Sequence, residues 1–295
     1  MTLSVVIITY NEEANIARTL ASVQPLVADG KGEIIVVDSG STDRTVEIAK
    51  SYGAKVFVEE WKGFAAQKNS AIDKASGDWI LSLDADEEVE PELGSTLNVM
   101  FPKWDEIDQY ARSKGYRPRD VHENFQTWHE LDNAHSLETD YYYDGFFIRR
   151  KNFFLARWIK HGGFWPDPKL RLFRRGIGRV ENRVVHETFK VDGVVATDMG
   201  KGALLHHSYP TLTDYLDHMN RYSSLGAEML VAKGPVRFST FNIIVRPAAT
   251  FLYNYIFRLG FLDGREGLLL HLYHAVYVSW KYSKAWELSR KKTST

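Results

Sequence analysis

The chain has 295 residues, 44% of them hydrophobic, so it can bury a sizeable core as one large α/β domain or as a catalytic domain with an appendage, and intrinsic disorder is excluded. It has no cysteine, which excludes disulfides and thiolate metal sites and fits a reducing cytoplasm. The first 100 residues carry a net charge of −9 (8 Lys and Arg against 17 Asp and Glu) and the remainder +8 (29 against 21), which suits a cation site followed by a region that binds phosphates or an anionic membrane, with chance asymmetry as the alternative.

Strands and helices are expected to alternate through the first part of the chain. Leu3–Thr9 is a β-branched run with no basic residue before it, so we expect a buried strand there rather than a signal peptide. Thr42 is the expected N-cap of the second helix, and Gly53 follows its end. The expected strands are Leu3–Thr9, Glu33–Asp38, Lys55–Val58 and Trp79–Leu83, and the expected helices are Glu12–Val23, Thr42–Tyr52 and Phe64–Ala75.

This alternation predicts the fold class, an α/β protein with a mostly parallel, Rossmann-like sheet flanked by helices. Ligands of such sheets bind beyond the carboxyl ends of the strands. Asp38 and Asp84 both lie at such ends, which is the first reason to expect a function for them.

The chain after residue 100 is less regular. Residues 101–140 are polar with scattered aromatics and are expected to form an insertion, while Tyr141–Arg150 and Lys169–Arg174 are expected strands. A helix is expected near Pro210–Ala232, and the chain beyond Pro235 is apolar and aromatic. No stretch reaches about 18 uninterrupted apolar residues, so we expect no transmembrane helix.

Asp84-Ala85-Asp86 places two carboxylates at a strand end. Mg²⁺ and Mn²⁺ take oxygen ligands and keep part of their coordination shell for substrate phosphates, so the pair predicts a metal site that would neutralise charge on a departing nucleoside diphosphate. An acidic turn is the alternative, because this spacing is common. Asp38 could accept a hydrogen bond from a base or a ribose hydroxyl, and Glu12 could bind a ribose hydroxyl or simply suit the helix dipole.

Four blocks, SVVIITYNEEANI, VVDSGSTDRT, FAAQKNSAI and WILSLDADEEV, resemble in that order the donor-binding half of family 2 glycosyltransferases, which have a GT-A fold. The resemblance implies that Asp38 holds the uracil, Glu12 the ribose, and that Asp86 is the principal metal ligand. For Lys68, a place near the donor phosphates is implied, and a solvated helix lysine is the alternative. The donor-site residues so expected are Thr9, Tyr10, Glu12, Asp38, Lys68, Asp84 and Ala85, and the expected metal ligands are Asp86, Asp84 and His207.

The second half contains GFFIRRKNFFLARWIKHGGFWPDPKLRLFRR, VVHETF and LLHHSYPTLTDY, which resemble β-1,4-glucosyltransferases that extend the inner core of bacterial lipopolysaccharide. The resemblance implies transfer of glucose from UDP-glucose onto a core heptose with inversion of the anomeric carbon. It covers most of residues 141–290, whereas residues 101–140 look longer than in that group.

Glu187, next to His186, is the expected catalytic base. Inverting transfer needs a group that deprotonates the acceptor hydroxyl, and family 2 enzymes have an acidic residue at about this distance after the metal motif. A salt bridge to Arg183 or Arg174 is the alternative.

Further candidates for acceptor or phosphate contacts follow residue 160. The alternation in Leu170–Arg175 suggests that its arginines share one strand face. The aromatic side chains of 161–165 could stack on sugar rings or belong to the core, and a histidine such as His207 is more often structural than a ligand. The candidates are His161, Trp165, Arg171, Arg174 and His186.

The expected organisation is a GT-A-like catalytic domain over residues 1–209 and a helical C-terminal extension over 210–295. The catalytic domain divides into a donor half (1–100), the insertion (101–140) and an acceptor half (141–209). Trp280, Trp286 and the basic residues near them suggest helices that lie on an anionic membrane, or else a cap or a subunit interface.

The expected partners are a UDP-sugar donor, Mg²⁺ or Mn²⁺, and a lipid-linked or core saccharide acceptor, met in the cytoplasm with peripheral contact to the inner membrane; no nucleic acid is expected. Rival functions are family 2 transfer to a polyprenyl phosphate or a surface polysaccharide, and non-catalytic binding of a sugar nucleotide. A nucleotidyltransferase is a further rival, but residues 3–15 lack the glycine-rich loop that such enzymes carry.

Overall fold

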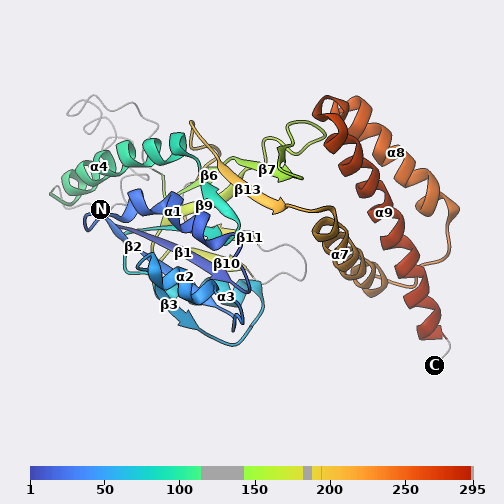
Figure 1. The fold of residues 1–295 in the computed structure, drawn as a ribbon, viewed down its shortest axis with the longest axis horizontal. Helices are drawn as coiled ribbons and strands as arrows, with labels where there is room; N and C mark the ends of the chain where they lie inside the picture. The colour runs from blue at the N-terminus through green and yellow to red at the C-terminus, as the bar shows by residue number, and fades with distance from the viewer. Residues whose placement is uncertain (114–142, 182–187, 194, 294–295) are drawn as a thin grey trace. The chain divides into compact units, whose positions relative to one another are not determined.

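The computed structural model describes residues 1–113, 143–181, 188–193 and 195–293 (Figure 1). The chain forms two compact units. The sheet unit comprises Met1–Arg149 and Pro168–Leu205, and the helical unit comprises Arg150–Asp167 and His206–Thr295. Each unit is therefore built from two separate segments of the chain, and the boundary expected at residue 209 stays a prediction.

A seven-stranded sheet forms the centre of the sheet unit. The strands β1 to β4 are mutually parallel where they pair, β9 runs antiparallel to both β4 and β6, and β12 is parallel to β6. In spatial order the strands are β12 (Val195–Ala196), β6 (Gly145–Ile148), β9 (Lys169–Arg174), β4 (Trp79–Asp84), β1 (Leu3–Thr9), β2 (Gly32–Asp38) and β3 (Lys55–Val58).

Helices cover both faces of this sheet, as the buried apolar runs of its central strands β1, β2 and β4 require. Val5 and Ile7 of β1 belong to a core cluster with Leu20 of α1, whereas Val6 between them belongs to a second cluster with Ile72 of α3. The helices of this unit are α1 (Ile16–Val27), α2 (Thr45–Ser51), α3 (Phe64–Asp73) and α4 (Pro91–Ser113). The predicted α/β class, a mostly parallel sheet flanked by helices with helices at the C-terminal end, is confirmed.

Two helices begin later than predicted. The helix expected from Glu12 begins at Ile16, and the one expected from Thr42 begins at Thr45. Thr42 is not the N-cap, because that position is Arg44; the Thr42 backbone N–H donates to Asn11 Oδ1 across the neighbouring loop at 2.8 Å. The residues expected to start these helices therefore form hydrogen bonds between the loops instead.

The later strands also differ in detail from the predictions. The strand expected over 141–150 is two strands, β6 and β7 (Arg150–Phe154), and residues 141–142 lie outside the described residues. Helix α4 extends into the expected insertion as far as Ser113, and Trp104 on it stacks against Trp79 at 4.6 Å. Residues 114–140 of that insertion lie outside the described residues. The short strands β5 (Glu87–Val89), β10 (Gly178–Glu181) and β11 (Thr188–Val191) complete the unit.

The helical unit consists of a small sheet and a group of helices. Its core cluster joins Phe154 and Ile159 to Tyr215 and Leu270. Among the described residues, no helix is both long and apolar enough to cross a membrane. The elements are β7, β8 (Arg157–Trp158), β13 (Leu204–Tyr209, in this unit from His206), α7 (Leu212–Ala232), the π-helices η2 (Phe241–Val245) and η3 (Tyr253–Phe257), α8 (Arg246–Leu252), the 3₁₀ helix η4 (Gly260–Asp263) and α9 (Gly264–Thr293).

Candidate active site

The loops that follow β1 and β2 are tied together at the carboxyl edge of the sheet. Thr9 pairs with Asp38 in register, so both loops leave the sheet at the same edge. The backbone N–H of Asn11 donates to Ser41 Oγ at 2.8 Å, and that of Glu12 donates to Thr45 Oγ1 at 2.7 Å. The two loops therefore form one fixed platform at the edge where α/β proteins bind ligands.

Asp38 shapes the second of these loops. Its side chain is fully buried and accepts hydrogen bonds from the backbone N–H groups of Gly40 and Ser41 at 2.9 and 2.8 Å. The Ser41 hydroxyl donates to its other oxygen at 2.5 Å. Gly40 has a φ of 86°, a conformation that glycine adopts without steric cost. The expected contact of Asp38 with a nucleotide base stays a prediction.

Several carboxylates gather at this edge. Burial raises the pKa of Glu12, the nearby charges of Asp86, Asp43 and Asp84 raise it further, and a hydrogen bond from Asn15 opposes the shift. The three aspartates are therefore close enough to Glu12 to disfavour its ionisation. A divalent cation would relieve that repulsion, which is the electrostatic requirement of a metal site.

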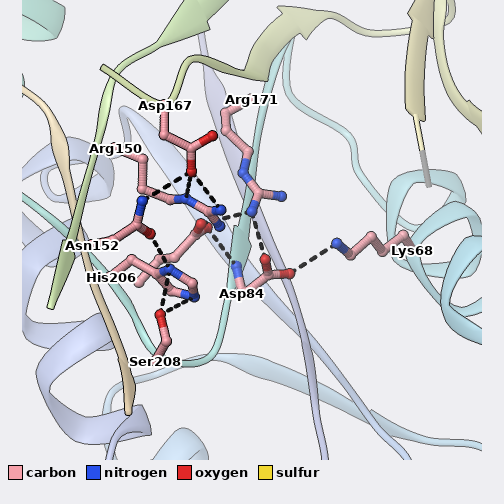
Figure 2. Close-up of polar contacts among 9 residues, drawn as sticks. Lys68, Asp84, Arg150, Asn152, Asp167, Arg171, His206 and Ser208 are labelled. Carbon is pink, nitrogen blue, oxygen red and sulfur yellow. Dashed lines mark hydrogen bonds and ion pairs between the residues drawn. The ribbon is translucent and has the colours of Figure 1, made fainter. Parts of the chain in front are cut away.

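Two cationic side chains contact the carboxylate of Asp84. Lys68 Nζ lies 2.9 Å from its Oδ1, and Arg171 donates to its Oδ2 at 2.5 Å and to Glu87 Oε1 at 2.7 Å (Figure 2). Burial alone would raise the pKa of Asp84, but Arg171 and Lys68 hold it well below its ordinary value. Asp84 is consequently ionised throughout the physiological range.

The carboxylates at this edge suit a hard cation that takes few protein ligands. Among the described residues, no group of three or more His, Cys, Asp or Glu side chains is arranged to hold a metal. Asp84 engages Lys68 through one carboxylate oxygen and Arg171 through the other. The backbone carbonyl of Ala85 accepts from the buried Thr19 hydroxyl at 2.7 Å, which fixes the turn between them. Mg²⁺ or Mn²⁺ here would complete its shell with diphosphate and water oxygens.

Buried polar groups at and near this edge have no partner within the described part of the chain. They include Thr9 Oγ1, Ser39 Oγ, the side-chain amide nitrogen of Gln67 and Arg171 Nε. Such groups are rare in native structures because each leaves a desolvation cost uncompensated, and a bound ligand can remove that cost. Ser39 and Gln67 were missed by the sequence reasoning, although Ser39 follows a strand-end aspartate and Gln67 precedes Lys68. Tyr10, next to Thr9, is 57% exposed.

Arg171 and Arg174 lie apart. Phe173 belongs to the core cluster that includes Ile72 of α3 and Leu172 to the opposite cluster, so the alternation of β9 places Arg171 and Arg174 on opposite faces. The expectation that these arginines share a face is therefore wrong, because they are an odd number of residues apart. Arg174 pairs in register with Trp79, at the other end of β4 from Asp84, and its guanidinium lies 4.7 Å from the Trp79 ring. The structure does not bring Arg174 to the carboxylates.

Three expected site residues lie in the helical unit and have structural partners there. His161 Nδ1 lies 3.0 Å from Asp263 Oδ1, and its backbone N–H donates to Asp263 Oδ2 at 2.8 Å. Trp165 contacts the Trp158 ring edge to face at 5.3 Å. His207 stacks on a phenylalanine of β7 at 4.9 Å. Their expected roles in metal or acceptor binding stay predictions.

A polar cluster joins β7 and β13 of the helical unit (Figure 2). Asp167 accepts from Arg150 at 2.8 Å and from Asn152 at 3.1 Å, and Asn152 Oδ1 lies 2.7 Å from His206 Nδ1. Ser208 Oγ lies 2.7 Å from the same histidine nitrogen. Asn152 and Asp167 were missed by the sequence reasoning, because only the pairing of distant strands brings them to His206.

The expected catalytic pair, His186 and Glu187, lies outside the described residues. The same holds for Arg183, the alternative partner of Glu187. The assignment of Glu187 as base therefore stays a prediction.

Comparison with known proteins gives the following similarities. The family model described as "Glycosyl transferase family 2" matches residues 4–177. An uncharacterized glycosyltransferase of Rickettsia typhi is 30% identical over 98% of this chain and 88% of its own length. The lipopolysaccharide core biosynthesis glycosyltransferase LpsC of Rhizobium meliloti is 29% identical over 93% of this chain and 88% of its own length.

One solved structure with local similarity is glucosyl-3-phosphoglycerate synthase from Mycobacterium tuberculosis, in complex with Mn²⁺, UDP and glucosyl-3-phosphoglycerate. It is 31% identical over 33% of this chain and 37% of its own length. The TM-score is 0.29, so the similarity is too local to support an argument about this chain.

Proposed function

The chain belongs to glycosyltransferase family 2, and on that premise we propose that it is a metal-dependent, inverting enzyme that transfers glucose from UDP-glucose to a core saccharide of lipopolysaccharide. The observation that carries the proposal is the group of carboxylates at the carboxyl edge of the sheet, backed by Lys68 and Arg171. The similarity to a lipopolysaccharide core biosynthesis glycosyltransferase over most of both chains supports the acceptor class.

On this proposal the donor lies on the platform formed by the two loops. Thr9, Tyr10, Glu12, Asp38 and Ala85 would contact the nucleoside. The buried hydroxyl of Thr9 supports this placement, because it lacks a partner among the described residues and a ribose or base can supply one.

The diphosphate would lie beside the Asp84-Ala85-Asp86 turn. Mg²⁺ or Mn²⁺, held by Asp86 with help from Asp84, would neutralise the charge that develops on the leaving diphosphate. Lys68 and Arg171 would keep Asp84 ionised and in place, because both contact its carboxylate oxygens. Lys68 is also the side chain that we assign to the donor phosphates.

The transfer itself would be a single displacement. The acceptor hydroxyl attacks the anomeric carbon, the bond from that carbon to the diphosphate oxygen breaks, and the hydroxyl proton passes to Glu187. A positioned base of this kind contributes roughly 10²–10⁴-fold to a rate. His161, Trp165 and His186 are further candidates for binding the acceptor or its phosphates, and His207 is a further candidate for the metal.

The acceptor class also implies where the enzyme works. A core saccharide under assembly is attached to lipid, so the enzyme would meet it at the surface of the inner membrane from the cytoplasm. We therefore propose a peripheral contact with that membrane.

The test is UDP release from a panel of UDP-sugars with Mn²⁺, with and without truncated lipopolysaccharide as the acceptor. Wild type is compared with Asp86→Asn and with Asp29→Asn, which removes an exposed carboxylate outside the cluster. We expect acceptor-stimulated release from UDP-glucose by wild type and Asp29→Asn, and a loss of about 10²-fold or more in Asp86→Asn because metal binding fails. Release that ignores the acceptor would reject the core-saccharide assignment. Equal rates in all three proteins would reject the metal assignment, and no release from any donor would reject catalysis.

A further inference from the structure

The helix that runs from Phe241 to Phe257 in the helical unit exposes an apolar face. Its exposed large hydrophobic side chains are separated by three or four residues, or by seven in the middle of the helix, which places them on one stripe. Ile244 is 61% exposed and Phe257 is 77% exposed. The stripe consists of Phe241, Ile244, Val245, Leu252, Tyr253, Ile256 and Phe257, and the exposed residues between its halves are Ala248 and Ala249 with Arg246 beside them.

The opposite face of this helix is already packed. In Figure 1, α8 lies alongside α9. Tyr255 lies near the buried His271 ring of α9 at 6.2 Å, and the Arg246 guanidinium lies 5.1 Å from the Tyr282 ring. Just before the helix, Phe238 contacts Trp286 at 5.2 Å. Because α9 covers the inner face, the outward stripe is a second apolar surface that the helical unit leaves uncovered.

The exposed apolar surface continues beyond the helix and is concentrated in this part of the chain. Thirteen of the twenty exposed large hydrophobic side chains found among the described residues lie between Phe238 and Leu272. Scattered exposed hydrophobics are normal on soluble proteins, but a contiguous group marks an interaction surface. After the helix, the exposed ones are Leu259, Phe261 and Leu262 in the segment that leads to α9, and Leu268 and Leu272 on α9 itself.

The charge around the stripe identifies the partner. From Met229 to Leu262 the sequence contains no Asp or Glu but four cationic residues, Lys233, Arg237, Arg246 and Arg258. The arginines of this group are exposed. Aromatic and aliphatic side chains on one face with only cations beside them are the composition of helices that lie in the interface of anionic membranes. A second copy of the chain would bring the same cations to this face, which disfavours self-association.

We propose that this stripe docks on the surface of an anionic phospholipid bilayer, with its apolar side chains among the acyl chains and the exposed Arg258 beside it at the phosphates. The Arg258 guanidinium lies 5.9 Å from the ring of Tyr253, a member of the stripe, and a basic residue near an anionic surface contributes to binding while screening is weak. The inference deepens the proposed function by stating which surface would bring the enzyme to a lipid-linked acceptor. It concerns binding alone, so it can fail while transfer stands.

The test is flotation of the full chain with vesicles, without donor or acceptor. One set of vesicles contains phosphatidylethanolamine with phosphatidylglycerol, and the other contains only phosphatidylcholine. We expect wild type to float with the anionic vesicles, and Ile256→Glu/Phe257→Glu to lose about tenfold or more of the bound fraction. Val99→Glu, which alters a 59% exposed residue of α4 in the sheet unit, is the matched control and should bind as wild type does. High salt should weaken wild-type binding.

Three outcomes would overturn the proposal. Wild type that fails to float with anionic vesicles excludes it, and so does a double variant that floats as well as wild type. A dimer in analytical ultracentrifugation that the double variant splits would assign the stripe to self-association instead. Thermal melting checks that the variants fold; if the double variant does not, Leu252→Gln/Tyr253→Gln, also exposed, takes its place.

Discussion

Arg171 joins the buried Glu87 to the partly buried Asp84 behind the candidate site. It is 4% exposed, donates to both Asp84 and Glu87, and Glu87 itself is fully buried. Burial opposes the charge of Arg171, but these carboxylates raise its pKa. Since each charge here is compensated only by its neighbours, the group is stable as a whole and sensitive to the loss of one member.

Arg171→Met should therefore destabilise the protein strongly. Asp84 and Glu87 would lose their shared cation, and breaking a buried ion pair in this way costs about 3–5 kcal/mol of unfolding free energy. Urea unfolding at pH 7 measures the change. In the control Arg179→Met, which breaks a pair that is more than half exposed, the loss should stay within about 1 kcal/mol. Similar losses in both variants would contradict the prediction.

Replacement of Glu12 should raise the stability of the folded protein, whereas replacement of Arg171 lowers it. Its pKa is raised in the folded protein, so the folded state binds more protons than the unfolded state between pH 4.5 and the raised pKa, and stability falls as the pH rises through that window. Glu12→Gln should then make the protein more stable at pH 7 and leave it unchanged at pH 4, at the expense of donor affinity. Thermal melts across this pH range, with Glu60→Gln as the exposed control, measure the effect. A variant that is less stable than wild type at pH 7 would refute the assignment.

At the scale of elements, the candidate site depends on how the loops after β1 and β2 are joined. Asn11 is central to that join. Its φ is 53°, its backbone N–H donates to Ser41, and its side-chain oxygen accepts from the Thr42 backbone. Asparagine tolerates this left-handed conformation better than most residues, and its short amide can reach the neighbouring loop from it.

Substitutions of Asn11 can separate conformation from hydrogen bonding. Asn11→Gly keeps the backbone conformation and loses the side-chain hydrogen bond. Asn11→Ala loses the same bond and adds backbone strain, so the Ala variant should be about 1 kcal/mol less stable to unfolding than the Gly variant. Both variants should bind the donor more weakly than wild type, because the platform is loosened in both. Isothermal titration with UDP and urea unfolding provide the two measurements. Equal affinity in all three proteins would show that the platform does not position the donor.

The strands of the first part could be predicted because their signals are local. Leu3–Thr9 and Lys55–Val58 were predicted with the bounds that the structure shows, since β-branched runs between turn residues have few alternatives. The starts of α1 and α2 were predicted too early because Glu12 suits the first turn of a helix and Thr42 suits an N-cap. In the structure their backbone N–H groups instead donate across the two loops. No local pattern distinguishes these uses.

The candidate site was predictable only in part for a related reason. Asp84 could be singled out because it ends a strand. The pairing of Arg171 with Asp84 depends on β9 lying antiparallel beside β4, which the chain sets by contacts between distant segments. The polar cluster of Asn152, Asp167 and His206 is non-local in the same way.

At the scale of the whole molecule, the chain passes between its two units more than once. Arg150–Asp167 leaves the sheet unit, contributes Phe154 and Ile159 to the core of the helical unit, and returns. Both side chains are 1% exposed, and their core partners, Tyr215 and Leu270, lie in α7 and α9.

A chain truncated after residue 209 should therefore fold poorly. It would retain Phe154 and Ile159 but lose α7 and α9, so we expect a lower melting temperature and strong binding of a hydrophobic dye. The melting of this truncated protein is compared with that of a second one, which ends at residue 205 and has a short Gly-Ser linker in place of residues 150–167. The second protein keeps only the segments of the sheet unit. A truncated protein that melts as cooperatively as the full chain would contradict the prediction.

The excursion through residues 150–167 also limits how relatives of this protein can be recombined. Joining the N-terminal part of one homologue to the C-terminal part of another at a single point after residue 205 would pair Phe154 and Ile159 from one parent with a helical core from the other. An exchange of the whole helical unit needs breakpoints near residues 149, 167 and 205 together. Chimaeras made with one crossover should thus mix two sets of core residues, whereas those made with three should inherit each core intact.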